Sequence, residues 1–404
     1  MPTVDQQRAE EERLLNSLDQ FSLASGGPLF RFYLRHRLAT PDLDLVKRRV
    51  LFFFLLGWLP LLIIAAWQGN VMGDAVRLPF LYDLEAHIRF LIVVPLFLVG
   101  EPYAHKRLKF LVTQFVERGI VPPEDYTEFN RIAGSTVRLR DSVSVELLLV
   151  ILVYAAGRQF WSHELDLKAS TWYGMVGTSG QTLTPAGYWY AFVTIPIFQF
   201  LFARLFFRLF LWARLLWQVS RLELRIFPTH PDRAGGLGFL EEVVDTFMPF
   251  LFALGSLLAA AIADRVFFAG AGVLDFKQDV LIVLGFLLLV ILGPLFFFTP
   301  LLVETKIKGN LWYGALASRY ADEFERKWIQ RGVSGDEPLV GSADIQSLAD
   351  MGGSFELVDR MRMVPFGKET VIQLLAISGA PLLPLTLTLF SPQEVFKRLL
   401  EALL

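Results

Sequence analysis

The chain has 404 residues, of which 54% are hydrophobic and 14% aromatic, and it contains no cysteine. The lack of cysteine excludes disulfide bonds, iron–sulfur clusters and zinc sites built on thiolates. The formal net charge of −2 excludes no class of partner, because the charged residues are unevenly spread along the chain.

The N-terminal region is predicted to form two cytosolic helices. Residues 3–22 are highly charged and place four apolar residues on one helical stripe, and the Gly-Gly-Pro sequence at 26–28 ends this helix. The next stretch, "LFRFYLRHRLA", is typical of a helix on the inner membrane surface, and packing against cytosolic loops is the alternative. The N-terminus lacks the basic start and short apolar core of a signal peptide, so the first apolar segment is expected to serve as an uncleaved insertion signal.

Seven apolar segments are long enough to cross a membrane as helices. Such a helix needs about 20 predominantly apolar residues to cross a hydrocarbon core of about 30 Å. The segments are 50–67, 82–102, 142–161, 187–209, 245–264, 279–301 and 370–390. The last is broken by "SGAPLLPL", so it either spans the membrane or re-enters it. The sequence therefore predicts an all-α integral membrane protein with a bundle of about seven transmembrane helices.

The distribution of lysine and arginine predicts the orientation of these segments. The first 49 residues, loop 103–140, the stretch from Arg204 to Arg233 and residues 303–369 hold 8, 7, 6 and 9 cationic residues, or 30 of the 38 in the chain. Cytoplasmic loops carry an excess of Lys and Arg. We therefore expect the N-terminus in the cytoplasm, whereas the side of the C-terminus depends on the last segment.

Four regions follow from this topology. They are cytosolic N-terminal helices at 1–49, transmembrane helices one to six at 50–302 with cytosolic loops at 103–140 and 210–244, a cytosolic helical region at 303–369, and a Pro/Gly-broken seventh span with an amphipathic C-terminal helix at 370–404. The cytosolic region is expected to begin with a long helix that continues out of the sixth span.

Ionisable residues near the ends of the spans form two layers in depth. The inner charge layer comprises Glu101, Arg140, Glu146, Arg204, Arg208, Asp245 and Glu304, and the outer charge layer comprises Glu85, His87, Arg89, Arg158, Asp264 and Arg265. A charge at membrane depth costs about 2.5–3.5 kcal/mol on insertion scales, so such residues normally pair or face water. We expect Arg204 and Arg208 to pair with acids such as Glu146 or Asp245. The alternative is that these side chains snorkel to the interface or pair within one helix.

The stretch "PTHPDRAGG" at 228–236 is the densest polar turn of the chain. Its prolines stop a helix, and its glycines permit backbone conformations that other residues avoid. The amides of a following helix predict a binding site for a small anion or an anionic lipid headgroup, formed by His230, Asp232, Arg233, Gly235 and Gly236. The alternative is a structural turn in which Asp232 accepts those amides as a cap or Asx-turn.

The sequence offers no motif of a known catalytic centre. It contains no HExxH, no GxSxG and no paired set of metal ligands, so we expect no metal, no cofactor and no nucleic-acid partner. The expected spans have no ionisable residue at mid-depth, which disfavours a proton pump. An enzyme is therefore unsupported rather than excluded.

Three stretches carry a resemblance to a known family. "THPDRAGGLGFL", "DIQSLADMGGSFELVDRMRMVPF" and "FVERGIVPPE" resemble a family of uncharacterised bacterial multi-span membrane proteins, and the resemblance extends over the whole chain. It implies a location in the bacterial cytoplasmic (inner) membrane and supplies no catalytic residues.

Three functions are compatible with these features. The first is a channel or transporter for a small ion or polar solute, assembled as a homo-oligomer, because the sixth and seventh spans are interrupted by Gly and Pro. The second is a membrane-anchored scaffold, sensor or effector that acts through its cytosolic helices. The third is a membrane enzyme acting on lipid-linked substrates. A continuous polar passage would favour the first function, and a solid mid-membrane core would favour the second.

Overall fold

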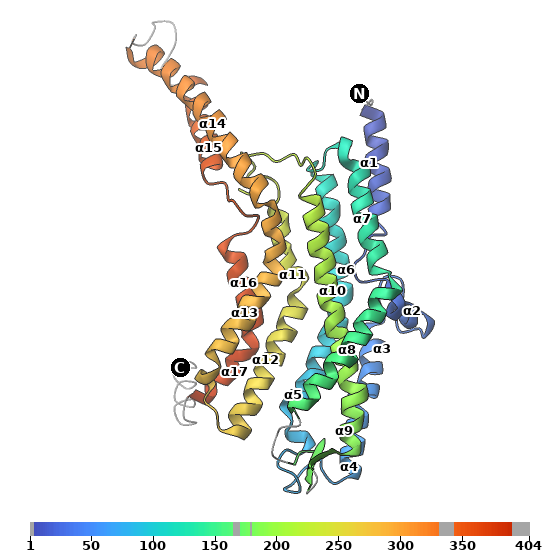
Figure 1. Cartoon of the computed structure of the whole chain (residues 1–404). Coiled ribbons are helices and arrows are strands. Elements are labelled where there is room, and N and C mark those ends of the chain that lie inside the picture. The colour runs from blue at the N-terminus through green and yellow to red at the C-terminus, as the bar shows by residue number, and fades with distance from the viewer. Residues whose placement is uncertain (1–3, 165–169, 178–179, 331–342, 390–404) are drawn as a thin grey trace.

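A computed structural model describes residues 4–164, 170–177, 180–330 and 343–389. Within these ranges the side chains of residues 4, 156–164, 176–177, 180–181, 269 and 389 are not described. Within these residues the fold is all-α apart from one small β-hairpin (Figure 1). The amphipathic helix predicted near the C-terminus lies outside the described residues.

The N-terminal region forms two helices, α1 (Val4–Leu18) and α2 (Gly27–Arg35). On α1 the expected apolar stripe packs against α6 and α7, and Leu14 and Leu18 are buried there. On α2, which contacts α8, Tyr33 is buried whereas Phe32 and Leu34 are exposed. The exposed apolar side chains of α2 suit a helix at the membrane surface.

The first half of the chain forms three long helices, each interrupted by one π-helical segment. The elements are α3 (Val46–Phe53), π (Phe54–Trp58) and α4 (Leu59–Trp67); α5 (Leu84–Ile88), π (Arg89–Val93) and α6 (Val94–Glu117); and α9 (Pro185–Trp189), π (Tyr190–Thr194) and α10 (Ile195–Val219). Between them lie α7 (Tyr126–Arg140), α8 (Val143–Glu164) and the antiparallel strands β1 (Gly174–Gly177) and β2 (Gly180–Leu183).

The three π-helical segments have a common cause. Pro60, Pro95 and Pro196 each lie two residues after the end of one segment. Proline donates no backbone hydrogen bond and clashes with the carbonyl one turn earlier, so a widened turn before it relieves the clash. The segments meet at Gly57, where an added Cβ would lie 3.4 Å from Phe90 and 3.7 Å from Thr194. A bulkier residue at this position would force the three helices apart.

The second half of the chain forms the other helices. They are α11 (Val243–Thr246), α12 (Met248–Ala269), α13 (Lys277–Leu292), α14 (Thr299–Phe324), α15 (Ala343–Asp359), α16 (Lys368–Gly379) and α17 (Leu383–Thr386). Short 3₁₀ segments interrupt this half at Gly293–Phe298 and Ala380–Leu382, where the sequence has Gly-Pro and Ala-Pro. The broken character expected for the sixth and seventh spans is therefore present in the backbone.

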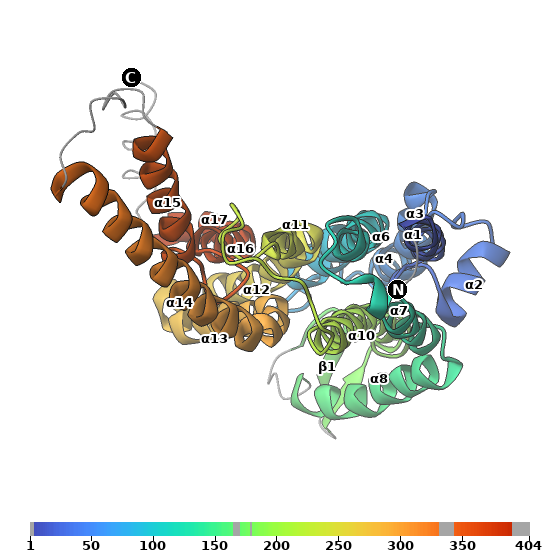
Figure 2. The same cartoon turned by 90° about the horizontal axis from the view of Figure 1, so that it is seen from above.

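The two halves pack side by side as an elongated bundle (Figures 1 and 2). The contact between them is made largely by α12, which packs against α5 and α6 on one side and α16 on the other. Aromatic rings fill the middle of this contact: the Phe97 ring lies 6.3 Å from that of Phe198 and 5.9 Å from that of Phe250. One hairpin, α14–α15, projects beyond the bundle at the end that carries the N-terminus (Figure 1).

Five helices are long and apolar enough to cross a membrane: Val46–Trp67, Pro185–Val219, Met248–Phe268, Val273–Gln330 and Lys368–Thr386. They contain five of the seven expected spans. The helix over Leu84–Glu117 and α8 are not among them, so the count of seven is not confirmed. The start of the fifth span is corrected, because the helix breaks at Phe247 and leaves Asp245 in the separate helix α11.

Candidate functional site

The polar turn at 228–236 is organised by one carboxylate. The oxygens of Asp232 accept the backbone N–H groups of Ala234, Gly236 and Gly238 at 2.8, 3.1 and 2.8 Å. Nδ1 of His230 lies 2.8 Å from the same carboxylate. The amides that were expected to hold an external anion are therefore hydrogen-bonded to Asp232, which is the alternative of a structural turn.

The turn keeps the Asp232 carboxylate ionised. Burial raises the pKa of this carboxyl, but the hydrogen bonds from Ala234, Gly238, Gly236 and His230 outweigh burial, so the pKa lies below its ordinary value. A carboxyl with a depressed folded-state pKa contributes stability above its unfolded pKa and loses that contribution as the pH falls through the folded value.

We predict a pH-dependent effect of Asp232→Asn. Between pH 5 and 8 the variant should be less stable by about 1–3 kcal/mol, because charge-assisted hydrogen bonds to a half-buried group are lost. The difference from the wild type should shrink as the pH falls below about 4, where the carboxyl of the unfolded chain takes up a proton, and it should disappear once the pH falls through the lower pKa of the native carboxyl. Thermal unfolding of both proteins across this range checks it, and a pH-independent difference would contradict it.

The turn also seats the base of the α14–α15 hairpin. An added Cβ on Gly309 of α14 would lie 2.6 Å from Pro228 and 2.9 Å from Val358 of α15, so these three residues are in close contact. The N–H of Arg362 donates to the Arg233 carbonyl at 2.7 Å. The Arg362 guanidinium donates to the Asp232 carbonyl at 2.9 Å and lies 2.5 Å from Glu241. The polar turn therefore holds the base of the hairpin and fixes where the hairpin leaves the bundle.

The hairpin is braced near its far end by Asp344. The Asp344 carboxylate accepts hydrogen bonds from Nζ of Lys327 at 2.6 Å and from Nε1 of Trp328 at 3.1 Å, and its carbonyl accepts from the Tyr320 hydroxyl at 2.8 Å. Lys327 and Trp328 lie in a further π-helical segment, Glu325–Gln330, that continues α14, whereas Asp344 lies in the first turn of α15. The two helices therefore form one unit. Large apolar side chains that this unit exposes are Leu311, Trp312, Leu316, Ile329, Ile345, Leu348 and Phe355.

A second polar site lies inside the bundle around Glu101. Its carboxylate accepts from Nη1 of Arg49 and from Nη2 of Arg208, each at 2.7 Å, and all three side chains are buried. Nη1 of Arg204 lies 3.9 Å from Glu146, which gives the pairing expected for Arg204. The pairing expected for Arg208 differs, because its acid is Glu101 and not Asp245. We call Arg49, Glu101, Glu146, Arg204 and Arg208 the inner cluster.

Arginines at this site also hold the N-terminal segment on the bundle. Arg140, Arg208, Arg204 and Arg49 donate to the carbonyls of Ser22, Ala24, Gly26 and Leu43 at 2.6, 3.3, 3.1 and 2.7 Å. These carbonyls belong to the segment on either side of α2. A buried carbonyl needs a donor, and the guanidinium fork supplies several in a fixed geometry.

Three members of the predicted inner charge layer lie away from the inner cluster's centre. Arg140 pairs with Asp141 at 2.7 Å at the edge of the cluster. Asp245 lies 3.8 Å from Arg107 and accepts from Gln373. Glu304 is exposed and pairs with Lys308 one turn along α14 at 2.6 Å. The layer is therefore not one site, because Asp245 and Glu304 face other helices.

Several residues of the outer charge layer contact aromatic side chains. Arg89 pairs with Glu85 one turn earlier and donates to the Tyr190 hydroxyl at 2.5 Å. Nδ1 of His87 accepts from Trp58 at 3.0 Å, and Asp264 accepts from the N–H of Glu85 at 3.0 Å. The Arg265 guanidinium lies over the Phe276 ring at 5.6 Å. The side chain of Arg158 lies outside the described residues.

Two buried charged residues were missed from the sequence. Arg49 was assigned to the cytosolic region, yet it is fully buried against Glu101. Asp83 was not singled out, yet its carboxylate caps α5 and accepts from Trp172 at 2.8 Å. The sequence feature that could have indicated their burial is their position, since each lies within one helical turn of an apolar run.

No protein-family model, curated protein or solved structure matches the chain. Within the described residues no group of three or more metal-ligating side chains comes together. What the fold defines is the class: an all-α protein with five helices able to cross a membrane.

Proposed function

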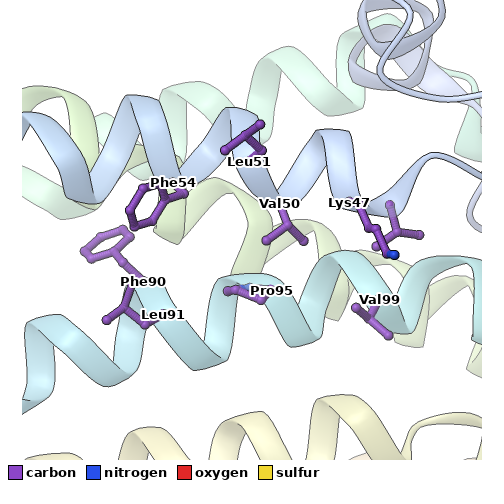
Figure 3. A pocket seen from close by; sticks show the side chains of 9 residues that line it. Lys47, Val50, Leu51, Phe54, Phe90, Leu91, Pro95 and Val99 are labelled. Carbon is purple, nitrogen blue, oxygen red and sulfur yellow. The ribbon is translucent and has the colours of Figure 1, made fainter.

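We propose that the chain is a multi-pass protein of the bacterial inner membrane with a cytoplasmic N-terminus and seven passes. The five apolar helices support membrane insertion, and the two remaining passes are Leu84–Glu117 and α8, which run along the same bundle (Figure 1). The orientation rests on the excess of lysine and arginine at one end. Lipid contact is supported by an apolar groove of about 350 Å³ between α3 and α6, with Lys47 at one end and Phe54, Leu91 and Val99 among its walls (Figure 3).

The topology predicts opposite locations for two positions. Reporter fusions at residues 25 and 170 should report the cytoplasmic and the outer side respectively. Three expected passes, an odd number, lie between the two positions, so they end on opposite sides of the membrane. The measurement pairs a reporter active only in the cytoplasm with one active only outside it. The same side for both positions would contradict the topology.

We further propose that the protein is a membrane-anchored effector or scaffold that presents the α14–α15 hairpin to a cytosolic partner protein. One observation supports this proposal. Beyond its contact with the polar turn, the hairpin exposes Leu311, Trp312 and Ile329 at 67, 64 and 70% of their surface. Contiguous apolar surface exposed to water typically marks an interaction site. In the proposed topology these residues lie on the cytosolic side beyond the hydrocarbon core, since the sixth span is expected to end at residue 301 and α14 rises about 1.5 Å per residue after it.

The inner cluster supports a scaffold over a passage. The charged residues of the inner cluster bind one another and the N-terminal segment. Charges that line an aqueous path face water. Here Arg49, Glu101 and Arg208 are each at least nine-tenths buried.

A cross-linking experiment tests the hairpin surface. A photo-activatable residue at Leu316 should give a discrete adduct with another protein in intact cells. Leu311→Asp with Trp312→Ser should abolish that adduct without lowering the melting temperature, because exposed apolar side chains contribute little to the fold. Arg319→Ser on the same exposed stretch is the matched control and should retain the adduct. An adduct that survives the double substitution would refute the proposal.

A channel or transporter is the second candidate, because α13 and α16 end in 3₁₀ segments at Gly293–Phe298 and Ala380–Leu382. Interrupted helices expose backbone groups that can coordinate a solute. Purified protein in liposomes separates the two candidates. Flux of ions or small polar solutes that the hairpin substitutions leave unchanged would favour the transporter.

A further inference from the structure

The inner cluster borders a small cavity between α8, α10 and the N-terminal segment. The cavity measures about 20 Å³ and is lined by Leu23, Gly26, Arg140, Glu146, Leu149, Arg204, Phe207 and Arg208. Its wall is therefore basic at the cluster and apolar where Leu149 and Phe207 stand. This combination suits a charged group that approaches along a lipid-facing surface.

The inner cluster holds more positive than negative charge. Three arginines, Arg49, Arg204 and Arg208, stand against two carboxylates, Glu101 and Glu146, which leaves one cation in excess. The neighbouring Arg140 and Asp141 balance each other. Tyr33, whose ring lies beside Arg49, is neutral at physiological pH, and burial raises the pKa of its hydroxyl further. An uncompensated buried charge is costly, so the cluster favours one more anion.

Among the described residues that line the cavity, Arg204 has one buried side-chain donor that is left without a hydrogen bond. This residue is only 7% exposed, and Nη2 donates to the Gly26 carbonyl at 3.1 Å. Nη1 has no hydrogen-bond partner within the described part of the chain. Its 3.9 Å separation from Glu146 exceeds hydrogen-bond range. Arg204 thus lines the cavity with one N–H of its guanidinium unused for hydrogen bonding, and Glu146 lines the same cavity.

The size of the cavity limits the ligand. A cavity of about 10–15 Å³ holds one water-sized probe, so 20 Å³ admits a single atom of oxygen or chloride size and not a whole phosphate. A ligand here inserts one anionic atom and leaves the rest of its group outside. A phosphate oxygen on a lipid headgroup and a free halide meet this requirement equally.

We propose that Arg204, with Arg140 and Arg208 beside it, forms an anion-binding site that takes one anionic atom, supplied by a phospholipid phosphate or by a free halide. Because Arg204 and Arg208 also hold the carbonyls of Gly26 and Ala24, occupancy of this site stabilises the N-terminal segment on the bundle. This site is separate from the hairpin surface and goes beyond the function proposed above.

Thermal unfolding of the full chain in nanodiscs tests the site and separates the two sources. One series titrates phosphatidylglycerol into a bilayer of a phosphate-free galactolipid at very low chloride, and the other titrates sodium chloride into the galactolipid bilayer alone, with sodium isethionate holding the ionic strength constant. A rise of the midpoint only in the first series identifies a headgroup, and a rise in the second identifies a halide. In the responsive series, Arg204→Gln should weaken the apparent affinity at least about tenfold, which corresponds to loss of one charge-assisted hydrogen bond.

Two further variants keep the test decisive. Arg214→Gln removes a cation from the same helix outside the cavity, where Arg214 contacts Ser135 and Thr136, and should leave the affinity unchanged. Glu146→Gln removes the competing carboxylate and should tighten binding, which is measurable even if Arg204→Gln fails to fold. The proposal is overturned if neither series stabilises the wild type, if Arg214→Gln weakens binding as much as Arg204→Gln does, or if Glu146→Gln does not tighten binding.

Discussion

Glu101→Gln should be the most destabilising single substitution of a charged residue in this chain. The change keeps the shape of the side chain but removes the one carboxylate that accepts from both Arg49 and Arg208. Removing one partner of a buried ion pair costs about 3–5 kcal/mol, because the other charge stays buried without compensation. Here two arginines lose their acid at once, so we expect a strongly lowered melting temperature or failure to accumulate in the membrane.

A double-mutant cycle distinguishes loss of the ion pair from a packing defect. Arg208→Met alone leaves Glu101 with Arg49, and Glu101→Gln with Arg208→Met removes one charge of each sign. The double variant should be more stable than the sum of the single effects predicts, because the uncompensated charge is smaller. Glu304→Gln is the matched control for the acid: Glu304 is 60% exposed and pairs only with Lys308 in the described residues, so its loss should cost at most about 1 kcal/mol. Additive effects in the cycle would contradict the ion-pair account.

The secondary structure was largely predictable because it depends on local chemistry. Blocks of apolar residues fix α10, α12 and α13 as helices, and the Gly-Pro and Ala-Pro sequences fix the breaks after α13 and α16. The π-helical segments were not predicted. Proline predicts a disturbance in a helix, but whether the turn before it widens, kinks or breaks depends on what packs there. Here three such turns meet at Gly57, which no single stretch of sequence reveals.

The inner cluster was predictable only in part, for a physical reason. The depth of a residue follows from its position in an apolar run, and on that basis Glu101, Arg204 and Arg208 were placed together. The partner that completes the site, Arg49, lies at the start of the first span and is buried because the segment before it folds back over the bundle. That fold-back is a tertiary contact between residues more than a hundred positions apart, such as Arg140 with Ser22.

The polar turn is the opposite case. Its local sequence indicated two alternatives, an anion site and a structural turn, but could not distinguish between them. Free amides, glycines and an aspartate are equally the ingredients of an anion site and of an Asx-type cap. The N–H groups of Ala234, Gly236 and Gly238 donate to Asp232, which favours the internal carboxylate. The second role of the turn, as the seat of the hairpin, depends on Gly309 and Val358, which are remote in sequence.

Gly235→Val should detach the hairpin from its seat. Gly235 has a φ of 68°, where a side chain is strained, and a Cβ there would lie 2.1 Å from Ile226 and 3.2 Å from Met361. The left-handed conformation costs an L-residue roughly 1–2 kcal/mol, and a β-branched residue more. The clash adds to this, because Ile226 must shift to admit the new side chain. We therefore expect a loss of more than about 3 kcal/mol, in the range that overpacking and backbone strain reach together.

Two controls separate backbone strain from the clash. Gly119 has a φ of 63° and open space around its Cα, so Gly119→Ala measures strain alone and should cost about 1–2 kcal/mol. Gly235→Ala should cost more than Gly119→Ala, and Ile226→Ala should recover part of the difference by removing the atom that the new Cβ meets. Since the chain has no cysteine, Cys introduced at Ser220 and Arg319 can carry spin labels without background. The distance between bundle and hairpin should be narrowly distributed in the parent and broad in Gly235→Val; an unchanged distribution would mean that the turn does not hold the hairpin.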